Sequence, residues 1–230
     1  TGIGRYAADM TLTGLLHGRF RFAEIGHARI KRIDTTKAKA LPGVVAVITD
    51  ADVPDRQYGL FIKDRRLFAK GVVRWEGEVV AAVAALTPEI AKRAVELIEI
   101  DYEPLPVITD IEAALAPGAP LIHENWESYW QDEKLVRSGN EASRSTIVKG
   151  DAAAALATAD VVVKGRYVAA GSQAAPIEPR AVLAEWRGDR VQIWSSTQVP
   201  FAARSLVSET LGLPENKIRV TVPHLGGGFG

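Results

Sequence analysis

The chain has 230 residues, of which 47% are hydrophobic and 24% are charged, a balance that suits one large or two modest globular domains. The 28 basic residues cancel the 28 acidic ones, so nucleic acid is a poor candidate partner, and no long apolar run suggests a membrane span. Cysteine is absent, which excludes disulfides, thiolate zinc sites and iron–sulfur clusters held by this chain. The first residues lack the layout of a signal peptide, and we expect a cytoplasmic protein.

The first half of the chain predicts a mixed unit of strands and one helix. Thr87 is a favourable N-cap, Pro88 suits the first helical position, and apolar residues then recur at helical spacing. Short runs rich in apolar and β-branched residues predict strands. The predicted order is strand 27–34, strand 44–49, strand 79–86, a helix from Pro88 and strand 98–103.

Between residues 113 and 147 the periodicity weakens, and proline, glycine and polar residues become frequent. This pattern is typical of a linker between domains. Three aromatic residues stand within it, Trp126, Tyr129 and Trp130. We expect them to hold the linker against a neighbouring surface rather than to bind a ligand.

Regular structure is predicted again from residue 150. An alanine-rich helix precedes a predicted strand at Val161–Ala169, and Gly188-Asp189 stands between two apolar runs, as in a β-hairpin. A helix is then predicted from Pro200, ending at Gly212, and it is followed by the strand 218–223. The last residues read HLGGGFG.

The terminal glycines are the first candidate site. Glycine lets the backbone lie close to a ligand, and successive N–H groups can then bond its oxygen atoms. The stretch is neither a P-loop, since no Gly-Lys-Ser/Thr follows, nor the spacing of a dinucleotide fold. On these residues alone, a flexible linker is the commoner interpretation.

Two further polar residues have two interpretations each. Gln198 and the hydroxyl residues before it precede the helix at Pro200, where they could cap the helix or present an amide to a bound group. Glu178 stands between Ile177 and Pro179, where it could be buried and functional or could pair with Arg180.

Glu76 and Glu78 bracket a glycine and are expected in a solvated loop. The four histidines lack metal-ligand spacing.

Taken together, these stretches resemble one family. The order of TGIGRYAADM, ALPGVVAVIT, GVVRWEGEVVAAVAAL and IEIDYEPLP resembles the a/b hammerhead domain that begins the molybdenum-cofactor subunit of the xanthine dehydrogenase/aldehyde oxidase family. IEPRAVLAEW, WSSTQVPF and VPHLGGGFG resemble the start of that family's molybdopterin-binding domain. The resemblance implies an α+β fold with a hammerhead domain at 1–115, a linker at 116–146 and an incomplete molybdopterin-binding domain at 147–230.

The resemblance also implies roles for particular residues. The family's glutamine beside the molybdenum matches Gln198, and Phe229 would also lie near the metal, although neither would ligate it. The family's glycine loop, which bonds the cofactor through backbone amides, matches Gly226, Gly227, Gly228, Phe229 and Gly230. We also expect Glu178 to be a pocket residue, on the ground of its place between Ile177 and Pro179. The family's catalytic glutamate lies far downstream, so no catalytic residue is expected in this chain.

The implied function is therefore partial. The complete enzyme would oxidise an aldehyde or heteroaromatic carbon with water as the oxygen source, using molybdopterin, possibly in its dinucleotide form. The implied partners are the rest of the molybdopterin subunit and the domains or subunits that carry iron–sulfur clusters and FAD. The chain would not be active alone. The alternatives are a noncatalytic docking module and an inactive remnant.

Overall fold

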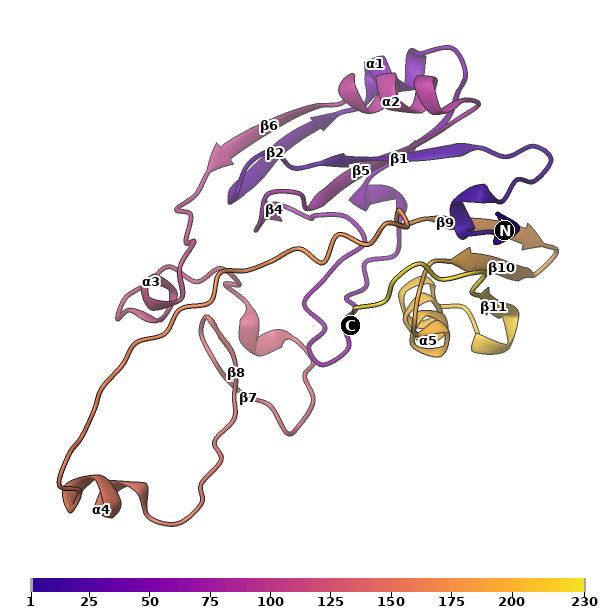
Figure 1. Cartoon of the computed structure of the whole chain (residues 1–230). Helices are drawn as coiled ribbons and strands as arrows, with labels where there is room; N and C mark the ends of the chain where they lie inside the picture. Colours follow the sequence, from indigo (N-terminus) through magenta and orange to yellow (C-terminus); the bar gives the residue numbers. More distant parts are fainter. Residues whose placement is uncertain (1, 230) are drawn as a thin grey trace.

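The computed structural model describes residues 2–229 and contains two units of sheet and helix joined by a long connecting segment (Figure 1). The first unit contains η1 (Ala7–Asp9), β1 (His17–Phe22), β2 (Ala28–Asp34), α1 (Thr36–Ala40), β3 (Val44–Ile48), η2 (Asp50–Asp52), β4 (Val72–Val73), β5 (Val79–Ala85), α2 (Pro88–Glu96) and β6 (Glu99–Pro104). The connecting segment contains α3 (Ile111–Leu115), η3 (Trp126–Ser128), β7 (Val136–Ser138), β8 (Glu141–Arg144) and α4 (Ala152–Ala157). The second unit contains β9 (Val182–Arg187), β10 (Arg190–Ser195), α5 (Pro200–Leu211), η4 (Glu215–Lys217) and β11 (Ile218–Thr221).

The first unit is layered, with β5 at its centre. Its strands form two three-stranded antiparallel sheets, in the orders β1-β5-β3 and β4-β2-β6, and α1 and α2 cover the outer face (Figure 1). Val83 of β5 faces the cluster beneath α2, whereas Val80 faces the cluster with β2 and β4. Because both faces of β5 are buried, its sequence is continuously apolar rather than alternating.

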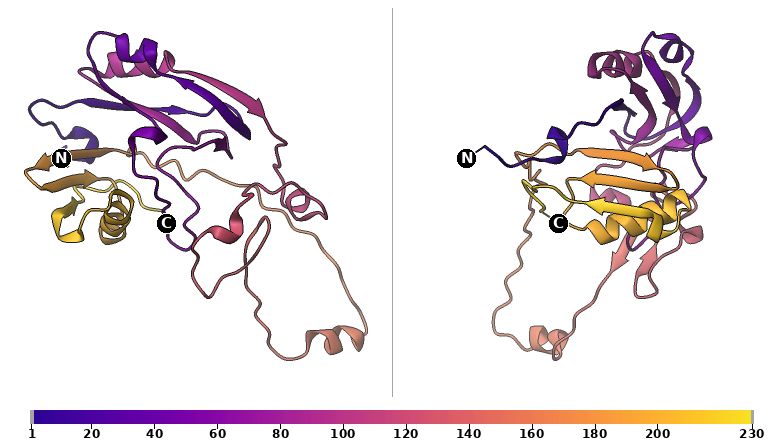
Figure 2. Two further views of the ribbon diagram at one scale, coloured as in Figure 1. Left: turned by 180° about the vertical axis from the view of Figure 1, so that it is seen from behind. Right: turned by 90° about the vertical axis from the view of Figure 1, so that its right-hand side faces the viewer.

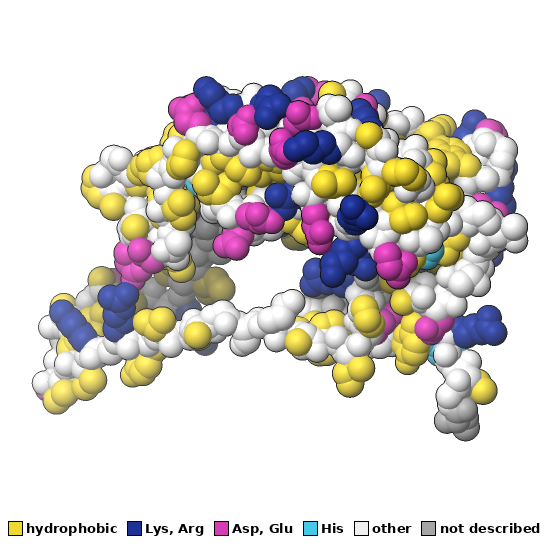
Figure 3. Space-filling view, turned by 90° about the horizontal axis from the view of Figure 1, so that it is seen from above, with side chains coloured by type: hydrophobic (Ala, Val, Ile, Leu, Met, Phe, Trp, Pro, Cys, Tyr) yellow, Lys and Arg dark blue, Asp and Glu magenta, His cyan; other side chains and the backbone are white. Residues whose placement is uncertain are grey.

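Helix α2 follows the sequence expectation closely. Thr87 is its N-cap, and the Thr87 Oγ1 accepts the N–H of Ile90 at 3.2 Å. Ala91 and Ala94 are fully buried, and their small side chains let the helix lie close to the sheet. Acidic and basic side chains are interspersed along the upper edge of the face seen in Figure 3. The predicted strands and helix of this unit are thus confirmed, with ends that differ by one or two residues.

In the second unit, β10 is the central strand and pairs with β9 and β11. The β9–β10 hairpin turns at Gly188-Asp189 as predicted, with Gly188 at a φ of 64°. Strand β11 runs parallel to β10, and α5 makes the crossover between them. Helix α5 ends at Gly212, which adopts a left-handed φ of 70°. Because β10 and β11 are parallel neighbours, the segments that follow them lie near each other: the β10–α5 turn and the segment after β11.

The connecting segment departs from the sequence expectation at one predicted strand. Helix α4 is confirmed and lies far from both units in each view (Figure 2). The strand predicted at Val161–Ala169 is wrong, because those residues form no regular structure. Val163 is 88% exposed, and no neighbouring strand within residues 2–229 hydrogen-bonds with this stretch. Strand-forming residues need a paired neighbour to form a ladder, and propensity alone does not supply one.

Of the three aromatic residues of the connecting segment, Trp130 contacts the first unit, as expected, whereas the ring contacts of Tyr129 and Trp126 are with His123 and Arg137 of the same segment. Trp130 lies under the ammonium of Lys63, 4.5 Å from the ring centre, and its carbonyl accepts the Lys63 N–H at 2.9 Å. Tyr129 packs edge-on against His123. The loop that carries Lys63 also reaches α5, where Lys63 pairs with Glu209 and Arg56 donates to the Glu209 carbonyl at 2.9 Å. This loop therefore ties both units to the connecting segment.

Candidate cofactor site

The glycine loop, residues 224–229, begins shortly after β11 and runs beside the chain that leads into β9. The N–H of Gly226 donates to Oε2 of Glu178 at 2.5 Å. Glu178 is 9% exposed, and no ion pair joins it to Arg180 among the ion pairs of residues 2–229. Glu178 is therefore buried and does not pair with Arg180 in the described residues.

Gln198 lies against the same loop from the other side. A β-carbon built on Gly228 would overlap Oε1 of Gln198. One built on Gly227 would lie 2.9 Å from Cβ of Pro176, and one on Gly226 would lie 2.6 Å from Cβ of Glu178. Side chains are therefore excluded at Gly226 and Gly227, whereas a β-carbon at Gly228 would displace the end of the exposed Gln198 side chain.

The hydroxyl residues before α5 serve the local backbone, and Gln198 does not. Oγ1 of Thr197 accepts the N–H of Val199 at 3.2 Å, and Oγ of Ser196 accepts the N–H of Ala181 at 3.0 Å. The exposed amide of Gln198 has no hydrogen-bond partner in the described part of the chain. The capping interpretation is therefore not observed for Gln198 in the described residues.

The glycine loop and the stretch that leads into β9 border a cavity of about 330 Å³. Glu178, Arg180, Ser196 and the loop residues Gly227 to Phe229 contribute to its wall, together with the stretch before β9. Ala175 and Phe229 adopt positive φ, 44° and 55°, the only such non-glycine residues within 2–229. Positive φ is strained for side-chain-bearing residues, and both residues flank this cavity.

The structure thus brings together the predicted residues Glu178, Gln198 and Gly226 to Phe229, whereas Gly230 lies outside the described residues. Sequence reasoning missed the contribution of the N-terminal segment. The backbone N–H of His224 donates to the Arg5 carbonyl at 3.1 Å. The ring of Tyr6 lies against Gly226. No local pattern could have indicated a contact between residues more than 200 positions apart.

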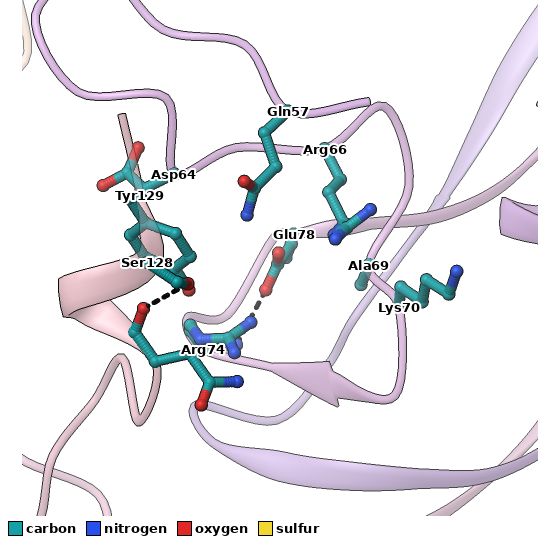
Figure 4. A pocket seen from close by; sticks show the side chains of 10 residues that line it. Gln57, Asp64, Arg66, Ala69, Lys70, Arg74, Glu78, Ser128 and Tyr129 are labelled. Atoms are coloured by element: carbon teal, nitrogen blue, oxygen red, sulfur yellow. Dashed lines mark hydrogen bonds between the residues drawn. The ribbon is translucent and has the colours of Figure 1, made fainter. Parts of the chain in front are cut away.

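A second cavity, of about 240 Å³, lies between the first unit and η3 (Figure 4). Arg66, Arg74 and Glu78 line it, and Ser128 and Tyr129 close its other side. Oε2 of Glu78 accepts the backbone N–H of Arg74 at 2.7 Å. The expectation that Glu78 lies in a solvated loop is wrong, because this carboxylate turns inward from the β4–β5 connection and is partly buried.

Burial raises the pKa of Glu78 above its ordinary value of 4.5, and the hydrogen bond from Arg74 offsets part of the rise. The folded state therefore holds this proton more tightly than the unfolded state does. Stability contributed by Glu78 is present at low pH and is lost as pH rises from 4.5 through the raised folded pKa. Urea unfolding of Glu78→Gln should show a flatter pH dependence than the wild type in this window. Glu76→Gln, the exposed neighbour, is the control, and parallel curves for all three proteins would contradict this assignment.

Comparison with known proteins gives these features a context. Two family models match the sequence: the aldehyde oxidase and xanthine dehydrogenase a/b hammerhead domain over residues 1–106, and the molybdopterin cofactor-binding domain over residues 136–230. The carbon monoxide dehydrogenase large chain of Afipia carboxidovorans is 37% identical over all of this chain and 29% of its own length. The chain belongs to the xanthine dehydrogenase and aldehyde oxidase family. It corresponds to the N-terminal part of the large subunit in that family.

Solved structures of the family agree with this fold. Quinoline 2-oxidoreductase from Pseudomonas putida superposes with a TM-score of 0.84 at 36% identity, covering all of this chain and 29% of that one. Aldehyde oxidoreductase from Desulfovibrio gigas gives a TM-score of 0.87 at 29% identity, covering all of this chain and 26% of that one. The predicted α+β class, a hammerhead domain followed by the beginning of a molybdopterin-binding domain, is confirmed.

The chain spans between 15% and 30% of the length of the curated relatives it matches. A putative xanthine dehydrogenase molybdenum-binding subunit of Escherichia coli, for example, is 33% identical over the whole chain and 30% of its own length. In the described residues, no helix is long and apolar enough to cross a bilayer. Within the same residues, no group of three metal-ligating side chains occurs.

The glycine loop fits the cofactor that the family implies. A bound cofactor with oxygen atoms needs close backbone approach and N–H donors that the protein has not already used. The loop meets the first need because a β-carbon at any of its three glycines would overlap a neighbouring atom of the protein. It meets the second because the N–H groups of Gly227 and Gly228 have no acceptor within residues 2–229. The adjacent cavity provides the space.

Proposed function

We propose that this chain forms the N-terminal part of the large subunit of a molybdenum hydroxylase and supplies one wall of its molybdopterin site. The observation that carries the proposal is that Glu178 and Gln198 both lie against the glycine loop, and that Glu178 and the loop border one cavity. These residues come from the β10–α5 turn, the entrance to β9 and the segment after β11. Membership in a family with a molybdopterin cofactor-binding domain supports the same proposal.

We assign the following roles to the residues of this wall. The backbone of Gly226 to Gly230 would surround the cofactor, with the N–H groups of Gly227 and Gly228 donating to its oxygen atoms. The carboxamide of Gln198 would lie beside the molybdenum without ligating it, and Phe229 would shield that side from water. Glu178 forms the inner wall. The bound molybdenum centre supplies two-electron oxidation with water-derived oxygen, and this chain supplies positioning and hydrogen bonds but no catalytic group.

For the complete enzyme we propose oxidation of an aldehyde or heteroaromatic carbon. The proposed partners are the rest of the molybdopterin subunit and the domains or subunits that carry iron–sulfur clusters and FAD. We propose domain bounds of 1–115 for the hammerhead, 116–146 for the linker and 147–230 for the partial cofactor domain. A cytoplasmic location completes the proposal.

Substitution of Gln198 in the complete protein tests the proposal. Gln198→Ala removes a carboxamide beside the metal, and we expect turnover to fall about tenfold or more, as for loss of one hydrogen bond to a charged group. Steady-state kinetics with a series of aldehydes and heteroaromatic compounds would measure the fall.

Gln57→Ala is the matched control, because Gln57 lines the other cavity. Unchanged turnover in Gln198→Ala would contradict the role of Gln198. Complete protein that folds, assembles with its partners and retains no molybdenum would instead favour the noncatalytic docking module.

A further inference from the structure

Glu178 has an unusual environment for a carboxylate. It is 9% exposed, and its one hydrogen bond among the described residues is the acceptance of the Gly226 N–H by Oε2 at 2.5 Å. Oε1 is buried and has no hydrogen-bond partner in that part of the chain. A buried carboxylate oxygen without a partner lowers stability. Packing alone would be served better by an apolar residue of the same size, so the carboxylate has another use.

The loop is held at the same residue from its outer side. Gly226 lies between Glu178 and Tyr6, because a β-carbon at Gly226 would come 2.6 Å from Cβ of Glu178 and 3.4 Å from the Tyr6 ring. Two residues earlier, His224 is bonded to the backbone of Arg5 in both directions, through its N–H at 3.1 Å and its Nδ1 at 3.1 Å. The Tyr6 and His224 rings are 6.0 Å apart. The N-terminal segment therefore limits outward movement of the loop.

We propose that Glu178 is a positioning residue that fixes the glycine loop in its ligand-ready shape before any cofactor binds. Its carboxylate accepts the hydrogen bond of the Gly226 N–H. The following N–H groups, at Gly227 and Gly228, have no protein acceptors in the described residues. A loop fixed in advance does not lose conformational entropy when the ligand arrives, so binding is stronger. This inference rests on the proposed function for the identity of the ligand, but not for the shape of the loop.

Hydrogen–deuterium exchange of the peptide that spans residues 222–229 tests the inference in the complete protein, prepared with and without molybdenum cofactor. In the wild type, the Gly226 amide should exchange slowly in both preparations. Glu178→Ala removes the acceptor and should speed exchange of this amide by about tenfold to a hundredfold, the range for a hydrogen bond to a charged group. Glu178→Gln keeps an oxygen acceptor of nearly the same shape and should give an intermediate rate.

Glu185→Gln is the matched control, since Glu185 lies on β9 and pairs with Arg187 at 2.6 Å, away from the loop. It should exchange as the wild type does. Equal exchange of the loop in wild type, Glu178→Gln and Glu178→Ala would overturn the inference, as would a wild-type loop that is protected only after cofactor is bound. If Glu178→Ala does not fold, the exchange rate of the Gly226 amide is compared between Glu178→Gln and Glu185→Gln, and faster exchange in Glu178→Gln supports the inference. A protected loop in protein that never binds molybdenum would leave this inference standing and remove the proposed function.

Discussion

Gly228→Ala is expected to reduce molybdenum retention by the complete protein about tenfold to a hundredfold. A β-carbon at this position would overlap Oε1 of Gln198, so the loop and the Gln198 side chain cannot both keep their places. Either displacement removes hydrogen-bond donors from the proposed cofactor site, and each such bond to a charged group contributes about 1.5–3 kcal/mol. Metal analysis of purified protein by inductively coupled plasma mass spectrometry gives the molybdenum content per subunit.

The control for this substitution is Gly18→Ala. Gly18 lies in β1, where a β-carbon would meet no atom within 4 Å and the backbone does not require positive φ. This variant should retain the wild-type molybdenum content. Full retention in Gly228→Ala would show that the loop does not approach the cofactor closely.

Ile98→Ala should produce the largest loss of stability from a single truncation in the first unit. Ile98 is 1% exposed and packs in the cluster formed by α1, α2, β3 and β5. Removing its side chain beyond Cβ loses burial and leaves a cavity, which typically costs about 2–5 kcal/mol of unfolding free energy. Urea unfolding measures the change as a lower midpoint with an unchanged slope.

Ile111→Ala in α3 is the matched control, because Ile111 is 75% exposed. We expect a change within about 0.5 kcal/mol, as is usual for surface positions. A loss of similar size in both variants would mean that Ile98 is not part of the packed core described above.

The sequence predicts the elements whose stability depends on near neighbours in the chain. Thr87 and Pro88 begin α2, and Gly212 ends α5, because capping and backbone preference act within one helical turn. The Gly188-Asp189 hairpin is likewise a local feature. The glycine loop is also visible in the sequence, because three adjacent glycines indicate close approach of the backbone.

The features that the sequence does not predict depend on distant partners. The stretch Val161–Ala169 has the residues of a strand, but a strand forms only where another pairs with it. The residues around Glu78 predict a solvated turn, yet η3, about 50 positions later in the chain, lies across the cavity from it. Tyr6 reaches Gly226 only because the N-terminal segment lies beside the glycine loop that follows β11.

The most direct test of the central proposal is anomalous X-ray scattering at the molybdenum edge from crystals of the complete protein with its partners. The account predicts one molybdenum peak beside Gln198 and the glycine loop, with the amides of Gly227 and Gly228 hydrogen-bonded to the cofactor. A molybdenum peak elsewhere, with the loop in contact with solvent, would contradict the account.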